Sequence, residues 1–411
     1  MTPRESRKLF VCYVPGLDSR RITPEQTPFI SQSMGFNPWA AISTLPNTEL
    51  LPTLITGVYP HEHGIWQVRL KPDAERLQRR RILDRAPDFL STTFQCLWKL
   101  FEPSYDLTAI PARRRRCFEL FRFKYERRRM DPNASLGKIG PYESIFGILG
   151  DDSKYYFTKS FDKLGSLLSQ LPSGGPRLEF LEMYALDLLQ HWNLDREETM
   201  RSAYQATDEF VRRLHENCQR RAVTLMLLVD HGQEPVVGAI PLAKELRRSG
   251  IPEEEFRYFM EVAQARFWFH TERARRRITD LLGTVGHTTV LGYKDLHRYH
   301  IGFEDEAYGE LYLIAEPGFI FFPHDFYHPL GNLFLGLTDR HQRSRIFQPR
   351  HRGNHGYLPE HPSEKGFAIL FDRDSTSIRP EIELIDFAPS VLAFLGVPKP
   401  QYMKGTHAFR E

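Results

Sequence analysis

Short apolar runs and helically spaced apolar residues alternate along most of this chain. Residues 9–14 form an apolar run that ends at Pro15-Gly16, which is typical of a buried strand stopped by a turn. Alternation of strands with helices predicts an α/β protein with a mainly parallel sheet. Further strands are expected over residues 177–186, 222–229 and 367–371, a helix over 195–220, and a change from strand to helix within 382–395.

Two stretches interrupt this alternation. The first is rich in Phe, Leu and Tyr and contains three arginine runs, which suit either a solvated helix face or a basic wall that holds an anionic substrate. The second begins with a charged segment at residues 252–282, which we expect to form a long helix. We therefore expect a core of residues 1–66, 150–235 and 350–411, a basic insertion at 67–149 and a second insertion or cap at 236–349.

Composition narrows the classes of protein. The chain has 411 residues, with 55 Lys and Arg against 52 Asp and Glu, and this near balance argues against a nucleic acid polymer as partner. No apolar run approaches the ~20 residues that cross a bilayer, so we expect no membrane segment and no secretion signal. The four cysteines are far apart, which excludes a cysteine-rich metal site and favours a cytoplasmic location.

Aspartate and histidine residues follow the expected strands. Asp187 and His191 stand four residues apart, Asp230 and His231 are adjacent, and His355 occupies the sequence Gly-Asn-His-Gly. Carboxylate oxygen and imidazole nitrogen together suit Zn²⁺ or a similar divalent ion. Each residue alone has a plainer interpretation, an Asp as a helix cap and a His as a hydrogen-bonded structural group. Their order after successive strands is what favours a metal site.

The same order resembles the type I phosphodiesterase/nucleotide pyrophosphatase family of the alkaline phosphatase superfamily. Residues 54–65, LITGVYPHEHGI, are similar to the family segment that follows its nucleophile, and residues 382–400 are similar to its C-terminal segment. The resemblance implies an alkaline-phosphatase-like core with helices on both faces of the sheet and a smaller inserted cap. It also implies a metal-dependent hydrolase that acts on a small phosphodiester or phosphomonoester.

By resemblance, the cofactors are two divalent ions, zinc or alternatively manganese, about 4 Å apart. Asp187, His191 and His355 would hold the first ion, and Asp230 and His231 the second. One ion would polarise the phosphoryl oxygen, and the other would activate a Thr or Ser nucleophile.

The first departure from the family pattern is Pro15, which stands where the family has a metal-binding Asp. Proline has no ligand atom. Asp18, three residues later, either reaches the metal site, as the replacement ligand, or merely caps the turn.

The second departure concerns the nucleophile. Thr44 begins a T-x-P-N match, but it lies three residues too far upstream of the Thr-Gly pair at 56–57. Counting back without a gap puts Asn47 in the nucleophile position, and its amide is no nucleophile. Thr48 is adjacent, near a helix start whose backbone N–H groups suit an oxyanion. Thr48 and Thr44 are thus either nucleophiles or turn and cap residues, with metal-bound hydroxide as the remaining attacking group, and Asn47 and Arg352 are expected to bind substrate.

These departures leave a second function open. A family member that has lost hydrolysis would act as an anion-binding or interaction protein. Pro15 and the ambiguous threonines favour this alternative, whereas the five remaining ligand positions argue against it. A sulfatase-like activity is disfavoured, because neither Cys nor Ser occupies the nucleophile position.

Overall fold

The computed structural model divides into two compact units. The first unit comprises Met1–Gly64, Met130–Gln233 and Pro359–Glu411, and the second comprises Ile65–Arg129 and Glu234–Leu358. Both expected insertions thus contribute to the second unit, while residues 130–149 belong to the first and 350–358 to the second. The structure describes residues 7–46, 49–67, 69–72, 87–102, 107, 110, 118–121, 136–172, 174–252, 254–371 and 377–409.

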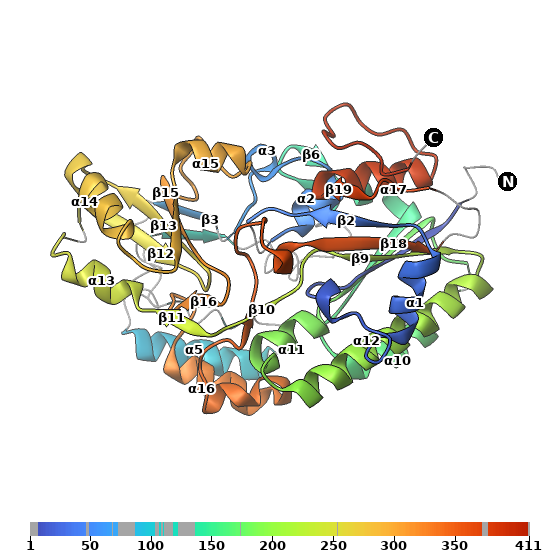
Figure 1. Cartoon of the computed structure of the whole chain (residues 1–411), viewed down its shortest axis with the longest axis horizontal. Coiled ribbons are helices and arrows are strands. Elements are labelled where there is room, and N and C mark those ends of the chain that lie inside the picture. Colours follow the sequence, from blue (N-terminus) through green and yellow to red (C-terminus); the bar gives the residue numbers. More distant parts are fainter. Residues whose placement is uncertain are drawn as a thin grey trace. The chain divides into compact units, whose positions relative to one another are not determined.

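The first unit is built on a seven-stranded sheet in the order β19-β2-β18-β9-β1-β8-β7 (Figure 1). β7, β8, β1 and β9 are parallel neighbours, β19 is parallel to β2, and β18 is antiparallel to both β9 and β2. The prediction of an α/β fold with a mostly parallel sheet is therefore confirmed. The strands are β1 Leu9–Tyr13, β2 Trp39–Ser43, β7 Ser153–Thr158, β8 Leu178–Met183, β9 Thr224–Val229, β18 Gly366–Phe371 and β19 Glu381–Glu383.

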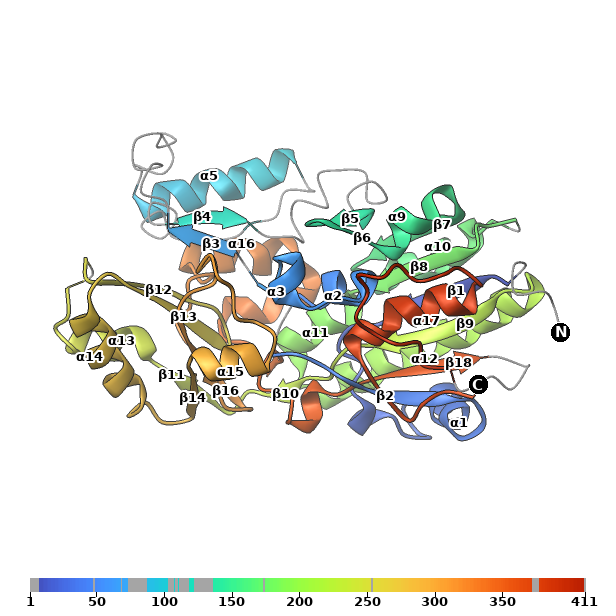
Figure 2. The same ribbon diagram turned by 90° about the horizontal axis from the view of Figure 1, so that it is seen from above.

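Helices cover both faces of this sheet (Figures 1 and 2). Side chains of α1, α10, α11 and α12 share one buried apolar cluster with the strands. On the other face, Phe180 of β8 contacts Phe146 of α9 and Phe387 of α17. The helices are α1 Pro28–Phe36, α2 Leu51–Thr56, α3 Pro60–His63, α9 Ile145–Leu149, α10 Leu164–Gln170, α11 Ala185–Asn193, α12 Glu197–Arg220 and α17 Phe387–Phe394.

Helix α12 shows how the sequence selects this packing. Met200, Ala203, Tyr204, Phe210 and Leu214 recur at helical spacing and are buried, while charged residues occupy the opposite face. Full burial of one large apolar side chain contributes about 1.5–3 kcal/mol, so this stripe fixes the helix against the sheet. The expected helix over residues 195–220 is confirmed.

Shorter elements complete the first unit. They are the hairpin strands β5 Lys138–Ile139 and β6 Tyr142–Glu143, and the 3₁₀ turns η2 Ser19–Arg21, η4 Gly150–Asp152, η5 Phe161–Lys163, η7 Pro362–Glu364 and η8 Leu384–Asp386.

The second unit contains a four-stranded antiparallel sheet in the order β12-β13-β15-β14. The expectation of one long helix over residues 252–282 is wrong, because β12 and β13 precede the helix α14. Phe256, Tyr258 and Met260 are buried at a spacing of two residues, which is the strand period, and aromatic residues favour strands. Only the arginine-rich run that follows these strands is helical, as α14 (Glu272–Leu282). The high charge of the whole segment led to the prediction of a longer helix.

No helix in the described part of the chain is long and apolar enough to cross a membrane. The elements of the second unit are as follows. The strands are β3 Arg69–Pro72, β4 Phe118–Phe121, β10 Glu234–Pro235, β11 Gly238–Ile240, β12 Phe256–Met260, β13 Gln264–Phe269, β14 Thr288–Leu291, β15 Leu311–Ala315, β16 Phe319–Phe321 and β17 Gly353–Asn354. The helices are α5 Asp88–Phe101, α13 Leu242–Arg248, α14 Glu272–Leu282, α15 Tyr293–Arg298, α16 Pro329–Thr338 and the 3₁₀ turn η6 Arg340–Ile346.

Candidate metal centre

Asp187 and His191 lie on one face of α11, in the first unit. The sequence predicted Asp187 at the end of a strand. β8 ends earlier, at Met183, and Asp187 stands in the first turn of α11. Residues four apart on a helix are neighbours, and the Nε2 atom of His191 lies 3.5 Å from the Oδ2 atom of Asp187. Asp187 is buried and His191 is nearly so. The helix thus presents one oxygen and one nitrogen ligand side by side.

Asp230 and His231 follow β9 directly. The Oδ1 atom of Asp230 accepts the backbone N–H of His231 at 2.9 Å, and its Oδ2 atom accepts the hydroxyl of Tyr13, at the end of β1. The Nδ1 atom of His231 lies 2.8 Å from the carbonyl oxygen of Gly232. Donation by Nδ1–H to that carbonyl leaves the lone pair on Nε2, which is the tautomer that a metal-ligating histidine uses.

The electrostatics of the centre favour a cation. Burial raises the pKa of Asp230, and the charge of Asp187 raises it further, whereas His231 and the Tyr13 hydroxyl oppose the shift. Burial lowers the pKa of His231, but the carboxylates of Asp230, Asp187 and Glu364 outweigh it, so the net shift is upward. Buried carboxylates that act on one another are stabilised by a bound cation. The donor set and the charge both fit a divalent ion.

Gln233 supports the helix ligand. Its Nε2 atom donates to the Oδ1 atom of Asp187 at 2.7 Å and lies 3.1 Å from the Asp187 carbonyl oxygen. Because these contacts fix the carboxylate and the backbone of the same residue, they hold Asp187 in one orientation.

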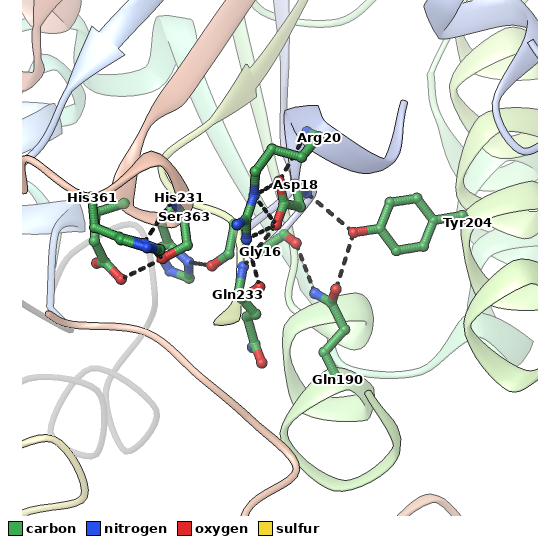
Figure 3. A network of polar contacts seen from close by, with 11 residues as sticks. Gly16, Asp18, Arg20, Gln190, Tyr204, His231, Gln233, His361 and Ser363 are labelled. Carbon is green, nitrogen blue, oxygen red and sulfur yellow. Dashed lines mark hydrogen bonds and ion pairs between the residues drawn. The ribbon is translucent and has the colours of Figure 1, made fainter. Parts of the chain in front are cut away.

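The turn after β1 packs against the same helix (Figure 3). Gln190 donates to the Gly16 carbonyl at 2.7 Å, and the Tyr204 hydroxyl donates to Gln190 at 3.0 Å. Gly16 has a φ of +78°, and a Cβ atom there would lie 2.8 Å from the Gln190 amide nitrogen and 3.2 Å from an Asp187 carboxylate oxygen. Any other residue would be strained by this backbone conformation and would crowd the side chains of Gln190 and Asp187.

Asp18 is buried and engaged by Arg20. It caps η2 by accepting the Arg20 backbone N–H at 2.9 Å, and the guanidinium contacts both carboxylate oxygens, with an Nη2–Oδ2 distance of 2.6 Å. Arg20 also donates to the Gln233 carbonyl at 3.0 Å. The turn-capping alternative is thus seen in the structure (Figure 3), and a ligand role for Asp18 stays a prediction.

Thr44 directly follows β2, and its hydroxyl donates to the Glu364 carbonyl at 2.5 Å. The side chain is buried. The other two residues predicted for this segment, Asn47 and Thr48, lie outside the described residues. α2 begins three residues after Thr48, with Pro52 in its first turn.

His355 and Arg352 belong to the second unit. His355 is buried and directly follows β17, which pairs with β10 so that Asn354 stands opposite Glu234. The Arg352 carbonyl accepts the Val236 N–H at 2.9 Å. Since Glu234 is bonded to Gln233, the last residue of that segment of the first unit, His355 lies close to the point where the chain passes between units. Its ligand role, and the phosphate contact of Arg352, stay predictions.

Sequence reasoning did not identify Tyr13, Gln233 or Glu364. Tyr13 and Gln233 are polar residues at or just beyond strand ends, and this position was the available signal. Glu364 lies in η7, where the Ser363 carbonyl accepts the Gly232 N–H at 2.7 Å and ties the histidine loop to the segment before β18 (Figure 3). Nothing local in the sequence indicates that contact.

Comparison with known proteins places the chain. Residues 42–358 match the type I phosphodiesterase/nucleotide pyrophosphatase family, and no curated protein matches the sequence. An inactive variant of murine ectonucleotide pyrophosphatase/phosphodiesterase 5, in complex with AMP, superposes with a TM-score of 0.63 at 14% identity, over 98% of this chain and 97% of that one. Human ectonucleotide pyrophosphatase/phosphodiesterase 5 superposes with a TM-score of 0.62 at 13% identity, over 97% of each chain. At this identity, the likeness to solved structures shows the shared fold. Because the family match covers most of its length, the chain belongs to the type I phosphodiesterase/nucleotide pyrophosphatase family.

Proposed function

We propose that the protein is a metal-dependent hydrolase of phosphodiesters or phosphomonoesters. The observation that carries the proposal is the set of buried Asp187, Asp230 and His231 with the largely buried His191, which combines oxygen and nitrogen ligands with excess negative charge in the first unit. Family membership supports the reaction class. The murine relative was solved with AMP, which supports a nucleotide-like phosphate ester as substrate.

In this proposal, Asp187 and His191 hold one divalent ion together with His355, and Asp230 and His231 hold a second. Zn²⁺ suits this donor set, and Mn²⁺ is the alternative. When bound, the ions would polarise the phosphoryl group and offset charge on the attacking and leaving oxygens.

The chain's own residues orient these ligands. Gln233 holds the carboxylate of Asp187, and Tyr13 holds that of Asp230. Such partners fix ligand geometry before substrate arrives.

Thr48 is the preferred nucleophile and Thr44 the second choice. Thr44 would have to give up its hydrogen bond to the Glu364 carbonyl before attacking, which is a cost that the sequence does not reveal. As the threonine oxygen would bond to phosphorus, its proton would leave and the ester P–O bond to the leaving alcohol would break; water would then hydrolyse the phosphothreonine and restore the hydroxyl. Asn47 and Arg352 would bind the phosphate oxygens, the latter through a guanidinium that matches phosphate geometry.

Metal analysis and turnover of bis-p-nitrophenyl phosphate test the proposal together. We expect bound zinc or manganese, and turnover that Asp230→Ala abolishes while the exposed control Asp152→Ala retains it. Turnover that survives in Asp230→Ala at the wild-type rate would refute the assignment.

A second function has its own support. Pro15 replaces the family Asp, and Arg20 occupies the carboxylate of Asp18, so the second ion has fewer ligands than the family pattern provides. A protein with phosphate affinity but neither bound metal nor turnover would be the anion-binding alternative.

A further inference from the structure

Helix α5 of the second unit exposes its apolar face, whereas an ordinary surface helix buries it. Its buried side chains are small or polar: Ser91, Thr92, Gln95 and Cys96. Its large apolar side chains point outward, with exposed fractions between 44% and 85%. These exposed residues are Phe89, Leu90, Phe94, Leu97, Trp98, Leu100 and Phe101.

A neighbouring helix extends this apolar face. α16 packs against α5 (Figures 1 and 2), and its side chains Leu333 and Leu337 are exposed. Single exposed apolar residues are ordinary, but a contiguous apolar face on a folded protein marks an interaction surface.

The composition of the sequence that contains α5 indicates the occupant. Residues 65–129 contain 17 Lys and Arg against 8 Asp and Glu, although the whole chain has a net charge of only +3. Exposed Arg340 and Arg343 add positive charge on η6, which packs on α16. A second copy would carry the same excess of positive charge in this segment, which disfavours a dimer. An apolar face of Phe, Leu and Trp beside basic residues is the composition of helices that lie in a membrane interface.

We propose that the apolar face of α5, with Leu333 and Leu337 of α16, docks on the surface of a membrane that contains anionic lipids. The helix would lie in the interface and not cross it, in agreement with the lack of a spanning helix in the described residues. The expectation of no membrane was based on the absence of a long apolar run, and that criterion does not test for a helix lying on the surface. The binding needs neither the metal centre nor hydrolysis.

Vesicle sedimentation with the full chain tests this surface. The face variant is Leu97→Glu with Phe101→Glu, two exposed positions four residues apart on α5. The matched control is Phe36→Glu with Val237→Glu, two apolar positions outside the patch that are 82% and 78% exposed, against 51% and 85% for Leu97 and Phe101. Circular dichroism and thermal melting check that both variants fold as the wild type does.

We expect the wild type and the control to sediment with vesicles of phosphatidylcholine and phosphatidylglycerol, and less with pure phosphatidylcholine. The face variant should bind at least ~10-fold more weakly, and added salt should weaken wild-type binding. No sedimentation, or equal binding of face variant and control, would overturn the proposal. A dimer that the face variant loses, without vesicle binding, would assign the surface to a second copy instead.

Discussion

Removing the hydroxyl of Tyr13 tests whether a cation binds beside Asp230, because the resulting loss of stability should depend on bound metal. The hydroxyl donates to Asp230, and both residues are buried. Burial, followed by the nearby charge of Asp230, raises the pKa of Tyr13 well above its ordinary value, so the phenol is neutral and acts as a donor to a carboxylate. A hydrogen bond to a charged group contributes about 1.5–3 kcal/mol.

Tyr13→Phe removes this donor and keeps the ring packed edge-on against Phe180, at 5.9 Å between ring centres. We expect the metal-free variant to lose about 2 kcal/mol in free energy of unfolding, because Asp230 keeps its charge in a buried place with one donor fewer. With zinc bound, the ion offsets that charge and the carboxylate accepts the phenol less strongly, so the loss should be smaller.

The control is Tyr156→Phe. The Tyr156 hydroxyl donates to Glu179, another buried carboxylate of the same sheet, which pairs with Phe10 and which we do not assign to the metal centre. Urea unfolding followed by circular dichroism, in chelator and in zinc, measures all four losses. The control should lose the same free energy in both conditions. Equal losses for Tyr13→Phe with and without zinc would show that no ion binds beside Asp230.

Three further predictions address the same unit. Because burial raises the pKa of Asp230, ionisation of this carboxyl destabilises the metal-free fold as the pH rises. Asp230→Asn should therefore raise the melting temperature in chelator at pH 7, and the gain should fade toward pH ~4. A loss of the same size at every pH would contradict this. Thr48→Ala or Thr44→Ala should lower the turnover rate of bis-p-nitrophenyl phosphate at least ~10²-fold, and wild-type activity in both variants would eliminate the threonine mechanism. Gly16→Ala should destabilise by at least about 1–2 kcal/mol in urea unfolding, whereas Gly35→Ala, in open space within α1, should gain about 0.5–1 kcal/mol; a neutral Gly16→Ala would refute the packing argument.

Strands were predictable where an apolar run ended at a strong turn signal. β1 and β9 appear within one or two residues of their expected bounds, and β9 places Asp230 and His231 directly at its end. Asp187 was misplaced by its local context, because the apolar run of β8 continues into α11 without a Gly or Pro to mark the change. Periodicity alone does not separate a strand from a buried helix turn.

The contacts that support the ligands were beyond sequence reasoning. Tyr13 meets Asp230 only because β1 and β9 are parallel neighbours in a register that pairs Tyr13 with Leu228. Local propensity specifies neither the neighbour of a strand nor its register. The exposure of the apolar face of α5 was not predictable for a related reason. The apolar stripe is visible in the sequence, but which face of the helix is buried depends on the surface that it packs against.

Gln233 connects the departures from the family pattern to the ligands that remain. Its side chain holds Asp187, and its carbonyl accepts Arg20, which in turn neutralises Asp18. Proline at position 15 provides no ligand, and Asp18 can serve as the replacement only if Arg20 releases it, which would also loosen the contact with Gln233 and hence the orientation of Asp187. Capping the turn and binding a second ion therefore compete for the same carboxylate. The number of ions bound per chain, measured in the wild type and in Arg20→Ala, decides between them: a rise on removing Arg20 means that the ion pair limits the second site.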